Sequence, residues 1–427
     1  MTAPRATAEP PSSSAPARFL PLAALFACVY FIQGIAEPTQ GLIAQPVRTL
    51  LADWGQSSAT IGSFMAIVSL PWSIKPLFGL IADFVPLGRS SRRNWLILMT
   101  ALTSVTLGWL AWSPPPAGDV RSLLWLLLAP TIGVAFTDVL ADSLMVEHGQ
   151  ARGWTGKLQS VQWTALSAAT IFAGSAGGWL AQRNQQHLGF LICAVASGCT
   201  LLLVAGWRGS RSAARESVPF DHRVKTLLGA LARGRFPAAA MFLFLWNFNP
   251  FSMTIHQLYM TQELGISEQF YGNTLSVAAV AWTIASAAYG VYCHRFSERT
   301  LVHLSILGGV VTTIAYVALQ GETSAMVIAA IAGLAYMTGT LIQLDLAARV
   351  CPPEVSGTLF ALLMSLSNLG VSLAEAAGGW LYEVWTRQWG AHAAFDALVV
   401  VGTLTTAACW LLLPWLTPAT PKAEPES

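Results

Sequence analysis

The stretch VSLPWSIKPLFGLIADFVPLGRSSRR, residues 68–93, joins a long apolar run to a group of arginines. Together with the residues before it, the run is long enough to cross a bilayer, because a helix needs roughly 20 apolar residues to do so. Lys75 lies inside the run, with a proline on each side. A charge at that depth is costly unless it is paired or faces a watery cavity. The stretch therefore predicts a membrane helix with one buried cation and a basic loop at its end.

The composition of the whole chain also indicates a membrane protein. Of the 427 residues, 54% are hydrophobic and 10% are charged, whereas soluble domains carry about 25% charged residues. This excludes a soluble protein with an oversized core. The net charge of +2 gives no indication of a nucleic acid partner. The six cysteines are scattered and form no CxxC pair, so we expect no metal site and no cofactor.

Dividing the apolar sequence into membrane-length segments predicts an all-α integral membrane protein with twelve transmembrane helices. These are expected at residues 20–44, 58–83, 94–113, 121–146, 157–181, 187–207, 236–260, 268–293, 300–319, 323–347, 355–382 and 392–414.

The connections between these segments are short, apart from one polar and basic stretch. It covers residues 208–235 and is expected to be a cytoplasmic linker between two six-helix bundles, at 19–207 and 236–416. The first 18 residues are rich in proline, serine and alanine, which is typical of a disordered tail. Residues 417–427 are expected to form a second cytoplasmic tail.

Lysine and arginine are unevenly distributed over this predicted topology. With both termini in the cytoplasm, the cytoplasmic segments hold 18 of the 23 basic residues, and Lys75 is the only one within a span. The outer loops hold Arg48, Arg121, Arg183 and Arg387. Basic residues favour the cytoplasmic side of a membrane, so the sequence predicts that both termini lie inside.

The two halves of the chain resemble each other at an offset of about 210 residues. WGQSSATIG (54–62) matches LGISEQFYG (264–272) as G-x-S-x4-G, and AGGWL occurs at 176–180 and again at 377–381. A parallel duplication of six spans, joined by a basic cytoplasmic loop, is the architecture of major facilitator transporters. In that fold the substrate site lies at the midplane between the halves.

The end of the second span resembles the facilitator signature G-x-L-a-D-r-x-G-r-k. Gly79 and Asp83 keep its spacing, and Arg89, Arg92 and Arg93 supply the basic loop. The glycine lets helices approach closely, and the aspartate can pair with a loop arginine. We expect these five residues to form a cytoplasmic gate. A plain positive-inside loop without a gating role is the alternative.

Two prolines inside expected spans are further gating candidates. Pro38 interrupts the first span and Pro250 the seventh. Proline frees backbone carbonyls and can bend a helix, and in transporters such breaks often line the substrate path. The polar residues before them, Glu37 and Asn249, are therefore expected along that path.

The buried cation has potential partners in the fourth span. Lys75 lies two turns before Asp83, about 12 Å deeper, and its counterpart in the second half is Ser286, so the repeat does not require it. Asp138 and Asp142 share a helix face. We predict a Lys75–Asp138 pair that faces the cavity, with Asp142 nearer the gate arginines. The alternative is an ion pair that only fixes helix packing.

Several other polar residues within spans are candidates for substrate or proton binding. Glu37 and Glu375 are buried carboxylates that could carry a proton. Asn249, Asn368 and Trp163 are candidate substrate contacts, although hydrogen bonding between helices or packing would also explain them. The chain has no nucleotide-binding glycine loop of P-loop form. Transport is therefore expected to be driven by an ion gradient or to be facilitated diffusion, and not to be driven by ATP.

Six stretches spread over nearly the whole chain together resemble the folate–biopterin transporter family. They are YFIQG (30–34), LPWSIKPLFGLIADFVPLGRSSRRNWLIL (70–98), DVLADSLMVE (138–147), GKLQSVQW (156–163), FLFLWNFNPF (242–251) and CPPEVSGTLFALLMSLSNLG (351–370).

The resemblance implies proton-linked movement of a pteridine-like organic anion, folate or biopterin, by a monomer in the bacterial inner membrane. It also implies that Lys75, Asp138 and Asp142 belong to the substrate or coupling site. A permease for another solute, such as a muropeptide-like or drug-like compound, is the alternative. A membrane enzyme should show clustered His, Asp or Glu at one membrane face, and a sensor should carry a large soluble domain. The sequence has neither feature, so we expect no enzyme.

Overall fold

The computed structural model describes residues 19–85, 87–88, 91–150, 154–206, 229, 235–293, 295–351 and 356–416. These residues form helices and connecting turns, with no strand among them. The expected linker at 208–235 and the two expected tails fall almost entirely outside the described residues, so their structure stays a prediction.

The N-terminal half contains six helical crossings, two of which are interrupted. Its helices are α1 (Phe19–Ala36), α2 (Ala44–Asp53), α3 (Ser58–Ser69), η1 (Leu70–Ile74), α4 (Lys75–Phe84), α5 (Ser91–Trp112), α6 (Val120–Gln150), α7 (Thr155–Gln182) and α8 (Gln186–Gly206). The second crossing consists of α3, the 3₁₀ turn η1 and α4 in succession.

The C-terminal half repeats this plan. Its helices are α10 (Phe236–Asn247), α11 (Met253–Leu258), the π-helical turn η3 (Tyr259–Glu263), α12 (Glu268–Tyr292), α13 (Glu298–Ile314), η4 (Ala315–Ala318), α14 (Glu322–Val350), α15 (Ser356–Trp389), α16 (Ala391–Ala408), η6 (Cys409–Leu412) and α17 (Leu413–Leu416).

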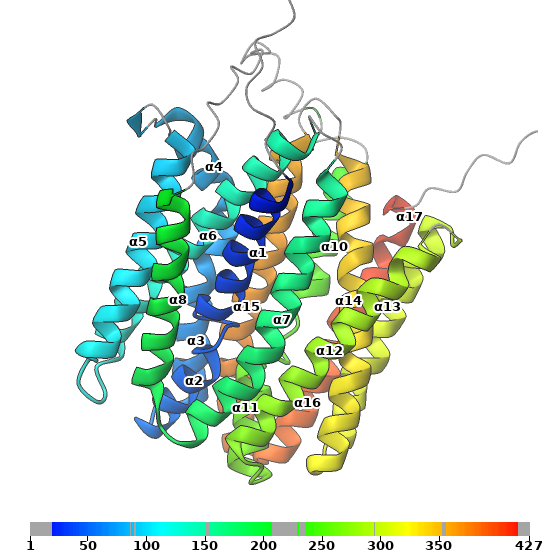
Figure 1. Cartoon of the computed structure of the whole chain (residues 1–427). Helices are drawn as coiled ribbons and strands as arrows, with labels where there is room; N and C mark the ends of the chain where they lie inside the picture. The colour runs from blue at the N-terminus through cyan, green and yellow to red at the C-terminus, as the bar shows by residue number, and fades with distance from the viewer. Residues whose placement is uncertain are drawn as a thin grey trace, which may run out of the picture.

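Ten of the described helical segments are long and apolar enough to cross a membrane. They account for ten of the twelve expected spans. The fifth expected span is α7, which is 28 residues long but is not among the ten. The seventh is divided between α10 and α11, and α10 is a shorter apolar helix of 12 residues. Figure 1 shows that α7 and α10 run alongside the other crossings, which agrees with the predicted twelve-helix fold.

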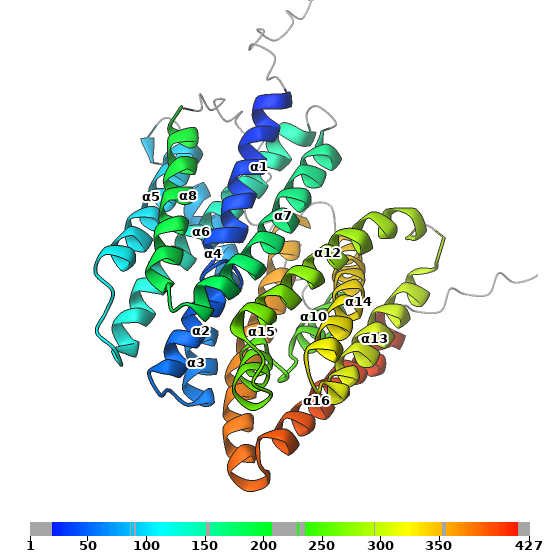
Figure 2. The same cartoon turned by 60° about the horizontal axis from the view of Figure 1, so that its bottom comes forward.

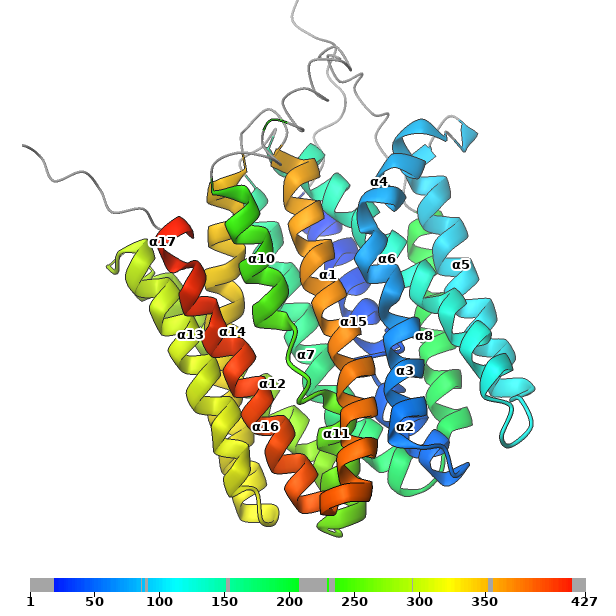
Figure 3. The same cartoon turned by 180° about the vertical axis from the view of Figure 1, so that it is seen from behind.

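The helices form two bundles side by side, as the views from the front and from behind show (Figures 1 and 3). Two buried clusters lie in the N-terminal bundle, one centred on residues such as Leu51 and Phe190 and the other on Phe26 and Trp95. Two further clusters lie in the C-terminal bundle. The apolar side chains therefore pack mainly within each half, which leaves the boundary between halves free to carry polar groups.

One end of the assembly carries both described chain ends, and we call it the terminal face (Figure 1, top). The opposite end carries the start of α3 and the α15–α16 connection, and we call it the far face. The two described chain ends therefore lie at the same end of the helical assembly.

The predicted end of the first span, at residue 44, is wrong. The helix α1 ends at Ala36, and after a turn segment the chain resumes as α2, which extends to Asp53. Pro38 is the second residue after the end of α1, and Glu37 stands between them. Proline disfavours a helical conformation in the residue before it, which explains why the helix stops there. The expected seventh span breaks in the same way after Asn247, just before Pro250.

The two bundles meet closely near the far face, where glycines allow backbone contact. A Cβ atom added to Gly178 of α7 would lie 2.9 Å from the carbonyl oxygen of Glu268 in α12. On the other side, a Cβ on Gly62 of α3 would collide with the carbonyl oxygen of Glu375 and lie 3.1 Å from Cα of Gly379, both in α15. The repeated glycine motifs thus form two related contacts between bundles. Figure 2 shows the helix pairs that carry them, α7 beside α12 and α3 beside α15.

Candidate functional site

The predicted pair between Lys75 and Asp138 is present in the structure. The Lys75 Nζ atom lies 2.6 Å from Asp138 Oδ2, and the two side chains are 18% and 6% exposed. Lys75 is the first residue of α4, and Pro76 occupies the first turn of that helix. Proline is well tolerated there because the first N–H groups of a helix have no internal partner. The interrupted second span therefore sets the lysine at a helix start, facing α6.

Two residues of α1 complete the acidic side of the site. Gln33 Nε2 donates to Asp138 Oδ1 over 2.9 Å, so both oxygens of that carboxylate are bonded. Tyr30, which is fully buried, donates its hydroxyl to Asp142 Oδ1 over 2.8 Å. The structure thus brings Asp138 and Asp142 together with α1 and gives Asp142 a tyrosine as its hydrogen-bond partner. That Asp142 lies nearer the gate arginines stays a prediction, since Arg89 is outside the described residues.

Trp72 connects this site to its surroundings in three directions. The Lys75 ammonium lies 4.5 Å from the centre of its ring. Its indole Nε1 donates to Glu37 Oε1 over 3.2 Å. Its backbone carbonyl accepts from Asn368 Nδ2 of α15 over 3.0 Å, a contact between the two bundles. A movement of Trp72 would therefore affect the cation, the break after α1 and the C-terminal bundle at once.

Glu37 lies at the break after α1 and organises the turn there. Besides Trp72, its carboxylate accepts from the Thr39 N–H and hydroxyl at 2.8 Å each and from the Gln40 N–H at 2.5 Å. The side chain is 6% exposed. Four donors satisfy a buried carboxylate that would otherwise be costly. The arrangement closes the turn that Pro38 opens.

Asn249 occupies the matching place before Pro250, between α10 and α11. Its Oδ1 accepts from the Phe251 N–H over 3.1 Å, which is again a side chain closing the turn around a proline. Gly402 of α16 makes room for it, since a Cβ there would collide with the Asn249 amide. Both broken helices therefore use a polar side chain directly before the proline, as Glu37 does in the first half.

A second polar cluster joins the bundles near the far face. Arg48 of α2 is 2% exposed, and its Nε donates to Gln257 Oε1 of α11 over 2.6 Å. Gln45 Nε2 donates to Glu268 Oε2 of α12 over 2.6 Å, and Gln257 Nε2 to Thr49 Oγ1 over 3.0 Å. The assignment of Arg48 to an outer loop is therefore wrong, because α2 continues the first span and buries the arginine between the halves.

Arg48 is also connected to the break that Glu37 closes. Its Nη1 lies 3.4 Å from the carbonyl oxygen of Thr39, the residue whose N–H and hydroxyl bond to Glu37. A continuous series of contacts thus leads from Lys75 through Trp72 and the turn to Arg48.

The remaining candidate residues are distributed over both bundles. Glu375 of α15 is 8% exposed, and its Oε2 has no hydrogen-bond partner among the described residues. Asn368 belongs to the site through Trp72. Trp163 is half-buried on α7, and among the described residues no hydrogen bond, ion pair or ring contact joins it to Lys75. The structure therefore brings together Lys75, Asp138 and Asn368 and leaves Trp163 apart.

The expected gate at the end of the second span is described only in part. Gly79 faces α6, where a Cβ would lie 3.7 Å from Val139. Arg93 donates from its guanidinium to the carbonyl oxygens of Val204, at 3.3 Å, and Ala205, so it caps the end of α8. Arg92 is half-buried. Arg89 and the side chain of Asp83 lie outside the described residues, so their gating role stays a prediction.

Our reading of single residues missed Tyr30, Gln33 and the role of Arg48. The first two stand in YFIQG (30–34), where a glutamine inside an apolar run was the available signal. No signal indicated that Arg48 turns inward, because its burial depends on α11 and α12, which follow it by about 200 residues.

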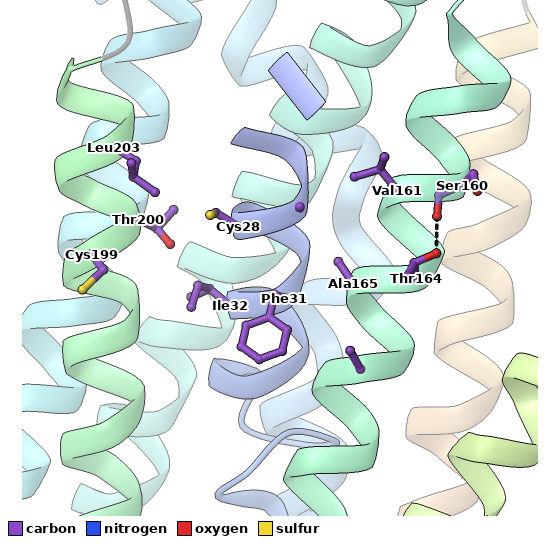
Figure 4. A pocket seen from close by; sticks show the side chains of 12 residues that line it. Cys28, Phe31, Ile32, Ser160, Val161, Thr164, Ala165, Cys199, Thr200 and Leu203 are labelled. Atoms are coloured by element: carbon purple, nitrogen blue, oxygen red, sulfur yellow. Dashed lines mark hydrogen bonds between the residues drawn. The ribbon is translucent and has the colours of Figure 1, made fainter. Parts of the chain in front are cut away.

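One groove on the N-terminal bundle lies away from these charges. It has a volume of about 520 Å³ and is lined by α1, α7 and α8, including Cys28, Phe31 and Cys199 (Figure 4). No charged side chain lines it, and its polar Thr164 donates to the carbonyl of Ser160 in its own helix. The groove is apolar and is therefore not the candidate site for an anion.

Comparison with known proteins places the chain in a family. The model of the BT1 family matches residues 33–425. The folate-biopterin transporter of Synechocystis sp. is 29% identical over 91% of this chain and 79% of its own length. The probable folate-biopterin transporter 4 of Arabidopsis thaliana is 23% identical over 84% of this chain and 87% of its own.

Solved structures agree on the fold. The nucleoside transporter NupG superposes with a TM-score of 0.72 at 13% identity, over 92% of this chain and 98% of that one. A D-xylose-proton symporter gives 0.73 at 14% identity, over 94% and 99%. The two bundles, their broken helices and their internal repeat are thus those of the major facilitator fold, and the chain belongs to the BT1 family.

Proposed function

We propose that this chain is a secondary transporter that moves a pteridine-type organic anion, folate- or biopterin-like, across the membrane by alternating access coupled to protons. The observation that carries the proposal is the Lys75–Asp138 pair on an interrupted helix. A lysine held by one carboxylate can exchange it for the carboxylate of a folate-like substrate. Asp138, once released, can accept hydrogen bonds from the amino and amide edge of a pterin ring.

Two further observations support the substrate class. The relatives over most of the chain bear the names of folate-biopterin transporters. Trp72 lies beside Lys75, and its indole offers a flat apolar face of the kind on which an aromatic ring can stack. We propose Asn249, Asn368 and Trp163 as additional substrate contacts along the path between the bundles.

The closed far face supports alternating access. The hydrogen bonds from Arg48 to Gln257 and from Gln45 to Glu268 join the bundles there. The glycine contacts of Gly62 and Gly178 also join the bundles near this face. We propose that the terminal face is cytoplasmic, as the basic residues indicate. The far-face contacts then form an outer gate. The site at Lys75 is reached from the cytoplasm in this state, and the gate at Gly79, Asp83, Arg89, Arg92 and Arg93 closes in the other. We further propose a monomer in the bacterial inner membrane.

The geometry distinguishes the two proposed proton carriers. Glu37 accepts four hydrogen bonds, so a proton on it would displace one of its donors. Glu375 has an oxygen without a donor among the described residues. We therefore assign proton transfer to Glu375, and we assign to Glu37, with Pro38 and Pro250, the shaping of the two helix breaks.

Uptake by proteoliposomes tests the function directly. Labelled folate and labelled biopterin are offered with and without an inward proton gradient, to the wild type and to Lys75→Met. We expect uptake that the gradient increases and that Lys75→Met removes. Lys157→Met, which removes an exposed lysine on α7, is the matched control and should transport normally. Absence of uptake of both compounds, with retained binding of a peptidoglycan fragment, would support a muropeptide permease.

A further inference from the structure

A small cavity inside the N-terminal bundle is lined by Gln33, the hydrogen-bond partner of Asp138, and by Thr137, the residue before Asp138. It has a volume of about 20 Å³, and residues of α1, α5, α6 and α8 line it. One water molecule needs a cavity of about 10–15 Å³ by this measure. The polar lining residues are Gln33, Thr100, Thr103, Thr137, Ser197 and Thr200. Gln33 is the residue that donates to Asp138, so the cavity is one side chain away from the candidate site.

Three polar atoms in the lining have no hydrogen-bond partner among the described residues. They are Gln33 Oε1, Thr137 Oγ1 and Ser197 Oγ. Thr137 is 7% exposed and Ser197 is 1% exposed, so bulk solvent does not reach them freely. Buried polar groups in native proteins are nearly always bonded to protein or to an ordered water. Three such atoms in the wall of one cavity therefore indicate a shared polar ligand.

The hydrogen-bonding capacity of the lining identifies that ligand. Thr100, Thr103 and Thr200 each donate the hydroxyl hydrogen to a carbonyl one turn back in the same helix, so toward the cavity they can only accept. Gln33 Oε1 is also an acceptor, whereas Thr137 and Ser197 have hydrogens to donate. The wall thus offers two donors and an excess of acceptors, which matches the two lone pairs and two hydrogens of water.

We propose that this cavity binds one ordered water molecule. The water accepts from Thr137 and Ser197, donates one hydrogen to Gln33 Oε1 and donates the other to a threonine hydroxyl of the wall. No charged side chain lines the cavity, and burying a bare cation without a counter-charge is far more costly than burying water. The chemistry therefore favours a neutral ligand.

The water would fix the amide of Gln33 in one orientation. With Oε1 bonded to water, Nε2 is directed to Asp138, as the 2.9 Å hydrogen bond requires. Gly133 supports this wall, because any Cβ there would collide with the Thr103 side chain and lie 2.8 Å from the carbonyl of Met99. The water site follows from the geometry of the N-terminal bundle alone. Only the effect of this water on substrate binding, through Gln33 and Asp138, rests on the proposed function.

A pair of matched serine substitutions tests the proposal by thermal unfolding of the purified full chain. Ser197 and Ser365 are both buried, at 1% and 4% exposure, and both have an unpartnered hydroxyl, but Ser365 is not part of this cavity. If water occupies the cavity, Ser197→Ala removes a bonded hydroxyl and should lower the Tm by about 2 °C relative to Ser365→Ala. If the cavity is dry, both substitutions remove an unsatisfied group, and an equal or higher Tm for Ser197→Ala overturns the proposal.

Two further measurements give independent outcomes. Thr137→Val removes the second donor and keeps the shape of the side chain. It should lower the Tm by a similar amount, and it tests the proposal even if Ser197→Ala does not fold. An experimental density map that resolves waters should show one peak within hydrogen-bond distance of Gln33 Oε1, Thr137 Oγ1 and Ser197 Oγ. A map without that peak overturns the site. The Tm is also compared in sodium chloride and in choline chloride. A higher Tm in sodium chloride that Ser197→Ala abolishes would show that the cavity binds a sodium ion, and this would overturn the proposal.

Discussion

Arg48 in α2 donates to Gln257 in α11 over 2.6 Å, and both side chains are buried at the junction of the two bundles. The two residues are 209 positions apart in the chain. Because the contact joins the halves only near the far face, it must break whenever that face opens. Its strength therefore helps set the balance between the two conformations of the transporter.

Loss of the Arg48 contact should shift this balance toward the far-open state. We expect Arg48→Leu to increase the far-open population at least about tenfold, a change of about 1.4 kcal/mol. Spin labels on the exposed positions Asp53 and Gln262, in a background without native cysteines, would report the distance between the bundles. A distance distribution identical to that of the wild type would show that Arg48 does not hold the gate.

The Lys75–Asp138 pair should show strong coupling in a double-mutant cycle. Breaking a buried pair leaves an uncompensated charge and typically costs about 3–5 kcal/mol. We therefore expect Lys75→Met and Asp138→Asn each to lower the Tm clearly, and the double variant to recover part of the loss. All three should lose uptake. Additive losses of stability would mean that the two side chains act independently, contrary to the 2.6 Å contact.

The indole nitrogen of Trp72 should contribute separately from its ring. Trp72→Phe keeps an aromatic face for Lys75 but removes the donor to Glu37. We expect a loss of uptake of about tenfold, because a hydrogen bond to a charged carboxylate contributes about 1.5–3 kcal/mol. Trp72→Ala should reduce uptake further. Equal uptake rates for the two variants would assign the whole effect to the indole N–H and none to the aromatic face.

Close contact at Gly62 should be essential for closing the far face. Gly62→Ala places a methyl group against the carbonyl of Glu375 and would push α3 away from α15. We expect a lower Tm and slower uptake. Gly290→Ala in α12 is the control, since its added Cβ would meet no described atom within 4 Å beyond the neighbouring backbone of its own helix, and alanine favours a helix over glycine by about 0.5–1 kcal/mol. Similar behaviour of both variants would contradict this packing role.

Proton coupling through Glu375 should be visible in the pH dependence of uptake. Glu375→Gln keeps the shape of the side chain and cannot change its charge. We expect residual uptake that no longer responds to a proton gradient, measured with and without an inward gradient. Glu37→Gln should reduce uptake while it keeps a response to the gradient, because the helix break is disturbed and the carrier remains. A gradient response retained by Glu375→Gln would contradict this assignment.

The sequence alone was sufficient to predict the helical architecture and one contact of the candidate site, the Lys75–Asp138 pair. Apolar segments of membrane length and the G-x-S-x4-G repeat depend on local composition, so they are visible in the chain itself. The pairing of Lys75 with Asp138 was also predictable, because a lone lysine in a span requires a partner at its own depth. The helical rise gave that depth for both residues.

Only the tertiary structure decided the helix breaks, the burial of Arg48 and the contacts of Tyr30, Gln33 and Trp72. Pro38 and Pro250 marked possible kinks, but whether a proline bends a helix or ends it depends on which side chains can close the freed turn. Here Glu37 and Asn249 do so. Arg48 is buried because α11 and α12 of the other half supply its surroundings. Sequence determines what each segment can bury, whereas the packing of distant segments determines which polar atoms meet.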